Sequence, residues 1–256
     1  MKKHRIKSFA AFVVVNLLAS GACSRADLFD VVANGSDIQL ASDGTTGGIG
    51  QSEIRVGYGS TLETVYVGAF ALPALPEGDT VHTANLRIAI IGGNDWTTLY
   101  QKGIDLYGVR LSSSPTVLAS DFYAGPYGDD PNGTPIMEHL VYQPNSVNAG
   151  FDSTLLGHHE TDDDADANLA GWLQTLYEDP SYDPAGTNYA ILRINSQGNI
   201  STAYRYFSVG SADNATESNR PLLTIESIPE PDVAALLFAG AAAMALRHRR
   251  SCRPPR

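Results

Sequence analysis

Short apolar or alternating runs recur along the middle of the chain, and turn-forming Gly, Pro, Asn and Asp residues separate them. This pattern is typical of an all-β sandwich, because successive side chains of a strand point to opposite faces of a sheet. In residues 85–90, for example, alternation places Leu86, Ile88 and Ile90 on one face. The pattern predicts about ten strands, enough for two packed sheets, at residues 37–41, 53–58, 64–71, 81–91, 104–111, 116–122, 137–142, 189–195, 203–209 and 221–226.

One stretch has helical rather than strand periodicity. Leu169, Trp172, Leu173 and Leu176 follow the i, i+3, i+4, i+7 spacing of a buried helical stripe. We therefore predict one short helix that ends before Asp179 and that holds Trp172 in the core.

The chain begins with a basic segment, an apolar stretch and then small residues. Lysines and an arginine occupy residues 2–7, the apolar stretch covers residues 9–18, and Ser24 and Ala26 stand at the spacing of a signal-peptidase site. This order predicts a secretory signal peptide, residues 1–26, cleaved after Ala26. A lipidated Cys23 is the alternative interpretation, although the residue three positions before it is Ser20 rather than Leu.

The other end carries a second apolar segment. Residues 233–246 contain no charged side chain, two prolines precede them, and arginines follow them. As a helix, these 14 residues would span roughly 21 Å, which is short of the roughly 20 residues that a full membrane span usually needs, so the segment by itself is a marginal anchor. Basic residues after the segment favour a cytoplasmic end. We expect a short C-terminal transmembrane helix; a helix docked in a globular core is the alternative.

Between these ends lies one domain, residues 27–227, which we call the body. It contains seven Lys and Arg residues against 26 Asp and Glu residues, a formal charge of −19. Such a surface repels nucleic acid and anionic lipid and suits cations or neutral polymers. The body has no cysteine, which excludes disulfides, cysteine-ligated zinc and a cysteine nucleophile there.

The C-terminal order resembles the PEP-CTERM sorting signal of Gram-negative-type bacteria, over residues 228–256. The matching residues are the motif Pro229-Glu230-Pro231, the apolar run, and the basic residues Arg247, Arg249 and Arg250. The resemblance implies recognition by an exosortase, a membrane-embedded cysteine protease that removes the anchor. It also implies transient residence in the inner membrane, then the outer-membrane surface or the extracellular polysaccharide matrix of a biofilm.

The body resembles a DNRLRE-type domain, a jelly-roll sandwich related to carbohydrate-binding modules. The resemblance is carried by residues 52–57, by residues 69–81 leading to 84–88, by the helix with Trp172 followed by Tyr189-Ala190-Ile191-Leu192-Arg193, and by the closing segments 206–208 and 219–225. The chain departs from the family where Val65 or Tyr66 replaces an arginine before the central strand, and the name-giving motif is not intact. The resemblance implies a jelly-roll β-sandwich more than a particular ligand.

An acidic cluster before the helix is a candidate metal site. Asp162, Asp164 and Asp166 alternate as in a calcium-binding EF-hand loop, and carboxylate oxygens suit calcium. An EF-hand is excluded, because Ala167 replaces the turn glycine and Leu173 stands where a bidentate Glu is needed. A solvated acidic helix start is the alternative, since the helix dipole favours negative charge there.

Loop aromatics are the second candidate site. Trp96 and Tyr100 follow a Gly-rich segment, and Tyr123 and Tyr127 flank Gly125-Pro126. Loops on a rigid scaffold often carry function, so these rings are a candidate sugar-stacking platform. A ring folded back over the core edge is the alternative.

We find none of the short motifs of serine hydrolases, phosphate-binding loops or dinucleotide-binding folds. A glycosidase needs only two carboxylates, and the sequence singles out no such pair. We therefore expect an exported, non-catalytic module associated with polysaccharide. A polysaccharide-active enzyme and a purely structural surface protein are the alternatives.

Overall fold

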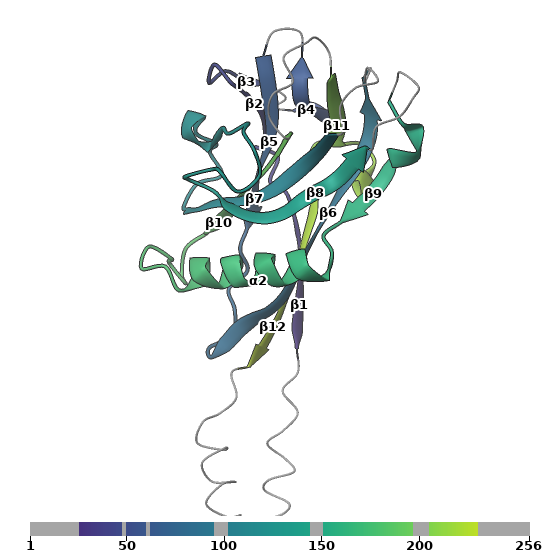
Figure 1. Cartoon of the computed structure of the whole chain (residues 1–256). Coiled ribbons are helices and arrows are strands. Elements are labelled where there is room, and N and C mark those ends of the chain that lie inside the picture. Colours follow the sequence, from purple (N-terminus) through teal and green to yellow (C-terminus); the bar gives the residue numbers. More distant parts are fainter. Residues whose placement is uncertain are drawn as a thin grey trace, which may run out of the picture. The chain divides into compact units, whose positions relative to one another are not determined.

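A computed structural model of the chain describes residues 26–47, 50–59, 62–94, 102–143, 151–196 and 205–229 (Figure 1). Most of these residues form β-strands, and one α-helix is found among them. The all-β expectation with one short helix is therefore confirmed. The predicted signal peptide before Ala26 and the sorting signal after Pro229 lie outside the described residues. Among the helices that are described, none is both long enough and apolar enough to cross a membrane.

The described residues contain twelve strands. They are β1 (Asp27–Val32), β2 (Ile38–Ala41), β3 (Thr46–Gly47), β4 (Glu53–Gly59), β5 (Leu62–Ala71), β6 (Asp79–Gly93), β7 (Lys102–Ser112), β8 (Thr134–Gln143), β9 (Gly157–Glu160), β10 (Tyr189–Ser196), β11 (Arg205–Gly210) and β12 (Leu222–Pro229). The helix is α2 (Asp163–Tyr177), and three 3₁₀ turns are η1 (Ala119–Asp121), η2 (Ser153–Leu155) and η3 (Glu217–Asn219).

The strands form one sheet of 12 strands. Its main path runs β1-β12-β6-β11-β4-β5-β10-β7-β8, with β2 paired to β5 and β3, and β9 paired to β6. Neighbours in this path are mostly distant in sequence, and the pairings among β2 to β11 are antiparallel. The chain therefore crosses repeatedly from one part of the sheet to the other.

Strand β5 is the corner at which the sheet curls. Thr64 pairs with both β4 and β2, so these two strands lie on opposite edges of β5. Val67 pairs with both β2 and β10, so β10 lies on the edge of β5 opposite to β2. On this same edge, β4 pairs with the earlier residues of β5. The two halves of β5 thus belong to different layers, as happens where a strand switches sheets.

The main core lies between the inner faces of the curled sheet. Buried side chains of β4, β6, β11 and β12 contact those of β5, β7, β8 and β10 in one cluster, which includes Val56, Ile88, Phe70 and Leu192. A second, smaller cluster lies on the other face of β5 and β10, around Val67 and Ile191. The sheet is therefore buried on both faces in this region.

Helix α2 connects the two layers. Its buried residues Leu169, Trp172, Leu173 and Leu176 belong to the main core, which confirms the predicted stripe. Towards β6, the amide N–H of Val81 donates to the Gln174 side chain (2.9 Å). Towards β8, the Asn168 amide donates to the carbonyl of Ile136 (3.1 Å). The helix therefore ties the layers together through both hydrogen bonds and apolar packing (Figure 1).

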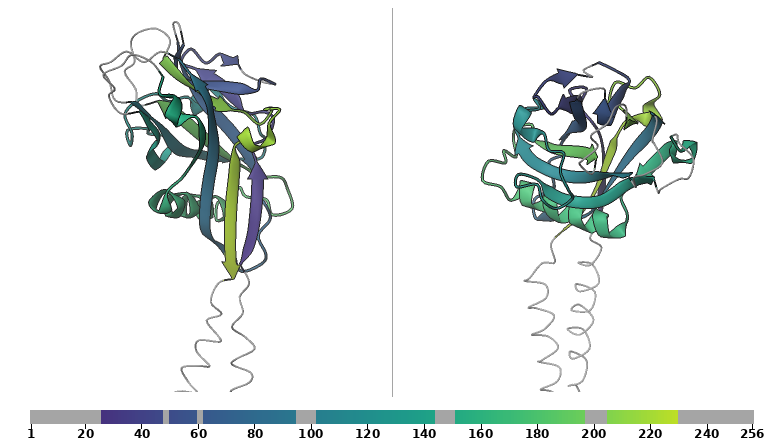
Figure 2. Two further views of the ribbon diagram at one scale, coloured as in Figure 1. Left: turned by 90° about the vertical axis from the view of Figure 1, so that its right-hand side faces the viewer. Right: turned by 45° about the horizontal axis from the view of Figure 1, so that its top comes forward.

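The first and last strands of the body are neighbours. Strand β12 lies between β1 and β6, and the hydroxyl of Thr224 donates to the carboxylate of Asp30 (2.8 Å). Figure 2 shows β1 beginning at the end of the sheet where β12 finishes. The chain thus enters and leaves the sheet at the same end.

By its internal contacts the chain divides into two units. Leu28–Leu75 and Val81–Ser227 form the larger unit, which contains both hydrophobic clusters. Met1–Asp27, Pro76–Thr80 and Ile228–Arg256 form the smaller unit. In its described part, the hydroxyl of Thr80 donates to the carbonyl of Ile228 (3.5 Å).

One predicted strand is wrong, and three strands were not predicted. Residues 116–122 form an irregular segment with the 3₁₀ turn η1, because the buried Asp121 binds Arg110 and the amide of Leu118 instead of a strand ladder. Strand β1 directly follows the predicted signal peptide, whereas β3 and β9 are only two and four residues long. Strands this short carry too few alternating residues to give a periodic signal.

Candidate functional site

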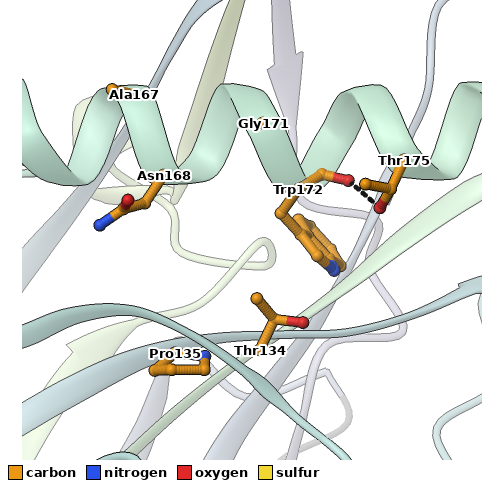
Figure 3. Close-up of a pocket in the computed structure, with 7 residues that line it drawn as sticks. All are labelled: Thr134, Pro135, Ala167, Asn168, Gly171, Trp172 and Thr175. Atoms are coloured by element: carbon orange, nitrogen blue, oxygen red, sulfur yellow. Dashed lines mark hydrogen bonds between the residues drawn. The ribbon is translucent and has the colours of Figure 1, made fainter.

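A shallow depression lies on the surface between α2 and the start of β8 (Figure 3). Its volume is about 330 Å³, at the lower end of the roughly 300–1,000 Å³ usual for small-ligand sites. The residues that line it are Thr134, Pro135, Ala167, Asn168, Gly171, Trp172 and Thr175. All of them are exposed except Trp172, so the depression is open along its length.

The sequence of α2 explains why the surface is hollow here. Ala167, Gly171 and Thr175 recur every fourth residue and therefore share one side of the helix. Their side chains are small, and a Cβ added to Gly171 would have no neighbouring atom within 4 Å. Asn168 holds β8 beside the helix through its bond to Ile136.

Trp172 forms the buried wall of the depression. Its side chain is only 7% exposed, and its ring packs on Gly108 of β7, where any side chain would clash with it. Figure 3 shows the indole nitrogen turned towards Thr134. No described residue accepts a hydrogen bond from this N–H, and the nitrogen reaches solvent, so the donor is available in the depression.

The remaining polar groups of the depression are uncharged. The Asn168 side-chain carbonyl has a free acceptor once its amide is bound to Ile136. The hydroxyl of Thr175 donates to the backbone carbonyl of Trp172 (2.6 Å) and keeps its lone pairs, while Thr134 exposes a hydroxyl. The site can therefore exchange hydrogen bonds with a neutral polar ligand and offers no counter-charge.

Two of the aromatic residues predicted as a sugar platform come together elsewhere. Tyr123 and Tyr127 both contact Tyr107, with ring centroids 6.2 and 5.6 Å from it. Burial raises the pKa of Tyr107 to about 12, and it also raises the pKa of Tyr123 and Tyr127. All three rings are therefore neutral hydrogen-bonding groups at physiological pH. Trp96 and Tyr100 lie outside the described residues.

Two of these tyrosines, Tyr107 and Tyr123, pack on a buried arginine that sequence reasoning did not single out as a site. Arg193 is 1% exposed and forms an ion pair with Asp130. Its guanidinium also donates to the carbonyl of Asp121 (3.0 Å) and lies over the rings of Tyr107 (4.8 Å) and Tyr123 (5.4 Å). The sequence does carry a signal for Arg193, because a charged residue stands at an alternating position among the apolar residues of β10.

A second arginine completes the attachment of residues 113–133. Arg110 binds both carboxylate oxygens of Asp121, each at 2.9 Å, and donates to the carbonyl of Thr116 (3.0 Å). Below this segment lies the smaller hydrophobic cluster, against which Val117 and Phe122 pack. The polar cluster of Arg110, Arg193, Asp121 and Asp130 therefore fastens a long connection onto the sheet.

The acidic residues before α2 have local structural partners. Asp162 is the N-cap, and its carboxylate accepts from the amide N–H of Ala165 (2.9 Å). Asp166 accepts from Asn85 (3.1 Å) and from the hydroxyl of Thr161, which joins the helix to β6. Asp164 is exposed in the first turn. Across the described part of the chain, no three or more His, Cys, Asp or Glu side chains are grouped to hold a metal ion.

No known family model matches the chain, and no curated protein matches it. The function therefore has to be inferred from the residues and from the geometry described above.

Proposed function

We propose that the chain is an exported surface or extracellular-matrix protein that an exosortase sorts through its C-terminal tail. In this proposal, residues 1–26 are a signal peptide and residues 228–256 are the sorting signal, while the body is a non-catalytic jelly-roll sandwich associated with polysaccharide. The observation that carries the proposal is the order of the tail: Pro229-Glu230-Pro231, an apolar run, then Arg247, Arg249 and Arg250.

The arrangement of β1 and β12 supports tethering through the tail. Both strands meet at one end of the sheet, so the signal peptide and the sorting signal join the body at the same end. The neighbouring first and last strands also favour the jelly-roll order, in which distant strands pair across a curled sheet.

The chemistry of the body favours binding over catalysis. Its buried carboxylates serve the fold: Asp121 and Asp130 bind arginines, and Asp37 accepts from the amide N–H of Ala212 (2.8 Å). The depression beside α2 exposes neutral hydrogen-bonding groups next to an indole ring. Neutral polymers also suit a body with a formal charge of −19.

Fractionation of the matrix tests the association with polysaccharide. We expect the protein to sediment with extracellular polysaccharide and to be released when the polysaccharide is digested, because the attachment is non-covalent. Digestion of matrix nucleic acid alone, with the polysaccharide intact, is the control for trapping in a general aggregate.

Two other outcomes identify the alternatives. Release of reducing sugar by the purified chain would make it a polysaccharide-active enzyme. Absence of binding to any polysaccharide of a broad panel would leave a purely structural surface protein.

A further inference from the structure

We propose that the depression between α2 and β8 is the polysaccharide-binding site of the body and that it takes a neutral sugar unit within a chain. This inference rests on the proposed function and adds the place of binding and the class of glycan. Its main support is the indole N–H of Trp172, a polar group on a side chain more than nine-tenths buried. This donor has no partner among the described residues and faces the depression (Figure 3).

The polar groups around the depression match the hydroxyls of a sugar. A hydroxyl both donates and accepts, so it can accept from Trp172 and donate to the free carbonyl oxygen of Asn168. The hydroxyls of Thr134 and Thr175 can act in either direction. These groups come from two elements that the Asn168–Ile136 hydrogen bond fixes against each other. The donors and acceptors are therefore held in place before any ligand arrives, which lowers the entropy cost of binding.

The apolar groups of the depression suit the C–H surface of a sugar ring. The edge of the Trp172 indole and the ring of Pro135 contribute apolar surface, and Ala167 adds a methyl group. Gly171 leaves the helix backbone uncovered between them. A ligand with both C–H surface and hydroxyl groups can use the whole lining, whereas a purely apolar ligand would cover the indole N–H without a partner.

Charge selects a neutral sugar. None of the seven lining residues is ionisable, so neither a uronic acid nor an amino sugar finds a counter-ion in the site. The body's formal charge of −19 further disfavours acidic polysaccharides. Neutral hexose polymers are therefore the expected ligands.

The open shape selects an internal unit of a polymer. Six of the seven lining residues are exposed, so the depression is open to solvent. A site of about 330 Å³ contacts a short stretch of chain. Affinity for a single site is therefore modest, and longer chains bind more tightly than the corresponding monosaccharide.

The test uses the full chain, purified in detergent, and affinity electrophoresis in gels that contain laminarin, mannan or galactan as neutral polymers. Gels with alginate or polygalacturonate provide the acidic comparison. Two substitutions alter the site. Gly171→Gln fills the depression from a position that has open space around it. Trp172→Phe removes the indole N–H but retains an aromatic ring packed on Gly108. Gly47→Gln is the control, because Gly47 is exposed and has open space around it but lies on β3, away from the depression.

We expect at least one neutral polymer to retard the unmodified chain. Each site substitution should weaken that binding about fivefold to tenfold, as loss of one or two hydrogen bonds would, and the Gly47→Gln control should not change it. Gly171→Gln adds a side chain where there is open space, so it should leave the packing of the fold unchanged. Thermal unfolding of this variant therefore distinguishes a loss of binding from a loss of folding.

The two proposals can fail separately. Retardation that Gly171→Gln and Trp172→Phe leave unchanged would place binding elsewhere and overturn this inference alone. Retardation by alginate or polygalacturonate but by no neutral polymer would overturn the glycan class. Absence of retardation in every gel would remove the polysaccharide role itself.

Discussion

At the scale of single residues, several ionisable side chains are buried in this fold, and each has a different environment. Asp37 is fully buried, and one of its oxygens accepts from the amide of Ala212. Its other oxygen lies near the hydroxyl of Tyr66, and neither atom forms a well-aligned hydrogen bond with a described residue. Burial, followed by the nearby charge of Asp213, raises the pKa of Asp37 from 3.8 to about 6.

Asp37 should therefore make the protein less stable above pH 6. The folded state holds the proton more tightly than the unfolded state, so stability falls as pH rises between 3.8 and about 6. The two pKa values correspond to about 3 kcal/mol in the free energy of unfolding. Asp37→Asn keeps an acceptor for Ala212 and removes the titration. We expect it to stabilise the protein at pH 7.5 by up to that amount and to give no gain at pH 3.5, measured by urea unfolding. Equal effects at both pH values would contradict this explanation.

Arg193 should be far more important for stability than an exposed arginine. Arg193→Met leaves Asp130 buried without its counter-ion, which costs about 3–5 kcal/mol in comparable pairs. Arg55→Met is the matched control, because Arg55 is 48% exposed and lies 3.6 Å from Glu53, and such surface pairs contribute less than about 1 kcal/mol. Urea unfolding of both variants gives the comparison. Similar losses of unfolding free energy in the two variants would show that the attachment of residues 113–133 to the sheet does not depend on the buried Arg193–Asp130 pair.

At the scale of elements, α2 shows how two glycines can have opposite roles. Gly108 of β7 lies under the Trp172 ring, so its missing side chain is what lets the helix dock. Gly171 is in the helix itself, is exposed, and has open space around it. The same substitution at these positions therefore tests packing in one case and helix propensity in the other.

We expect Gly108→Ala to destabilise the protein by about 1–3 kcal/mol, as overpacking of a core usually does. Gly171→Ala should instead stabilise it by about 1 kcal/mol, because alanine favours the helix over glycine. Thermal unfolding of the two variants measures both signs. A stabilised Gly108→Ala variant would mean that Trp172 does not pack on β7 as described.

The elements also show what the sequence reveals of this fold. The four residues of the α2 stripe predict the helix correctly, because their burial follows helical spacing regardless of the partner strands. Alternation likewise locates strands such as β6 and β10. It fails for residues 116–122, where Val117 and Phe122 are apolar because they pack against the smaller hydrophobic cluster. These tertiary contacts partly bury both side chains, and the Arg110–Asp121 ion pair holds the segment in place, which no local pattern reveals.

At the scale of the whole molecule, the candidate site depends on contacts between distant segments. Sequence patterns correctly place Trp172 in the core, but they do not show that its indole N–H faces the start of β8. That relation arises because Asn168 of α2 binds Ile136 of β8. The acidic residues and loop tyrosines are visible in the sequence, whereas their actual partners, such as Ala165 and Tyr107, become evident only in the fold.

The proposed export also belongs to the whole molecule, since both ends of the chain take part in it. The most direct test is the intact mass of the protein recovered from the outer-membrane and culture fractions, in cells with and without the exosortase. We predict loss of the residues from about Pro229 onward only when the protease is present, with the body then outside the cell. A complete tail retained in the inner membrane of both kinds of cell would contradict the sorting mechanism, and the C-terminal segment would then be an ordinary anchor.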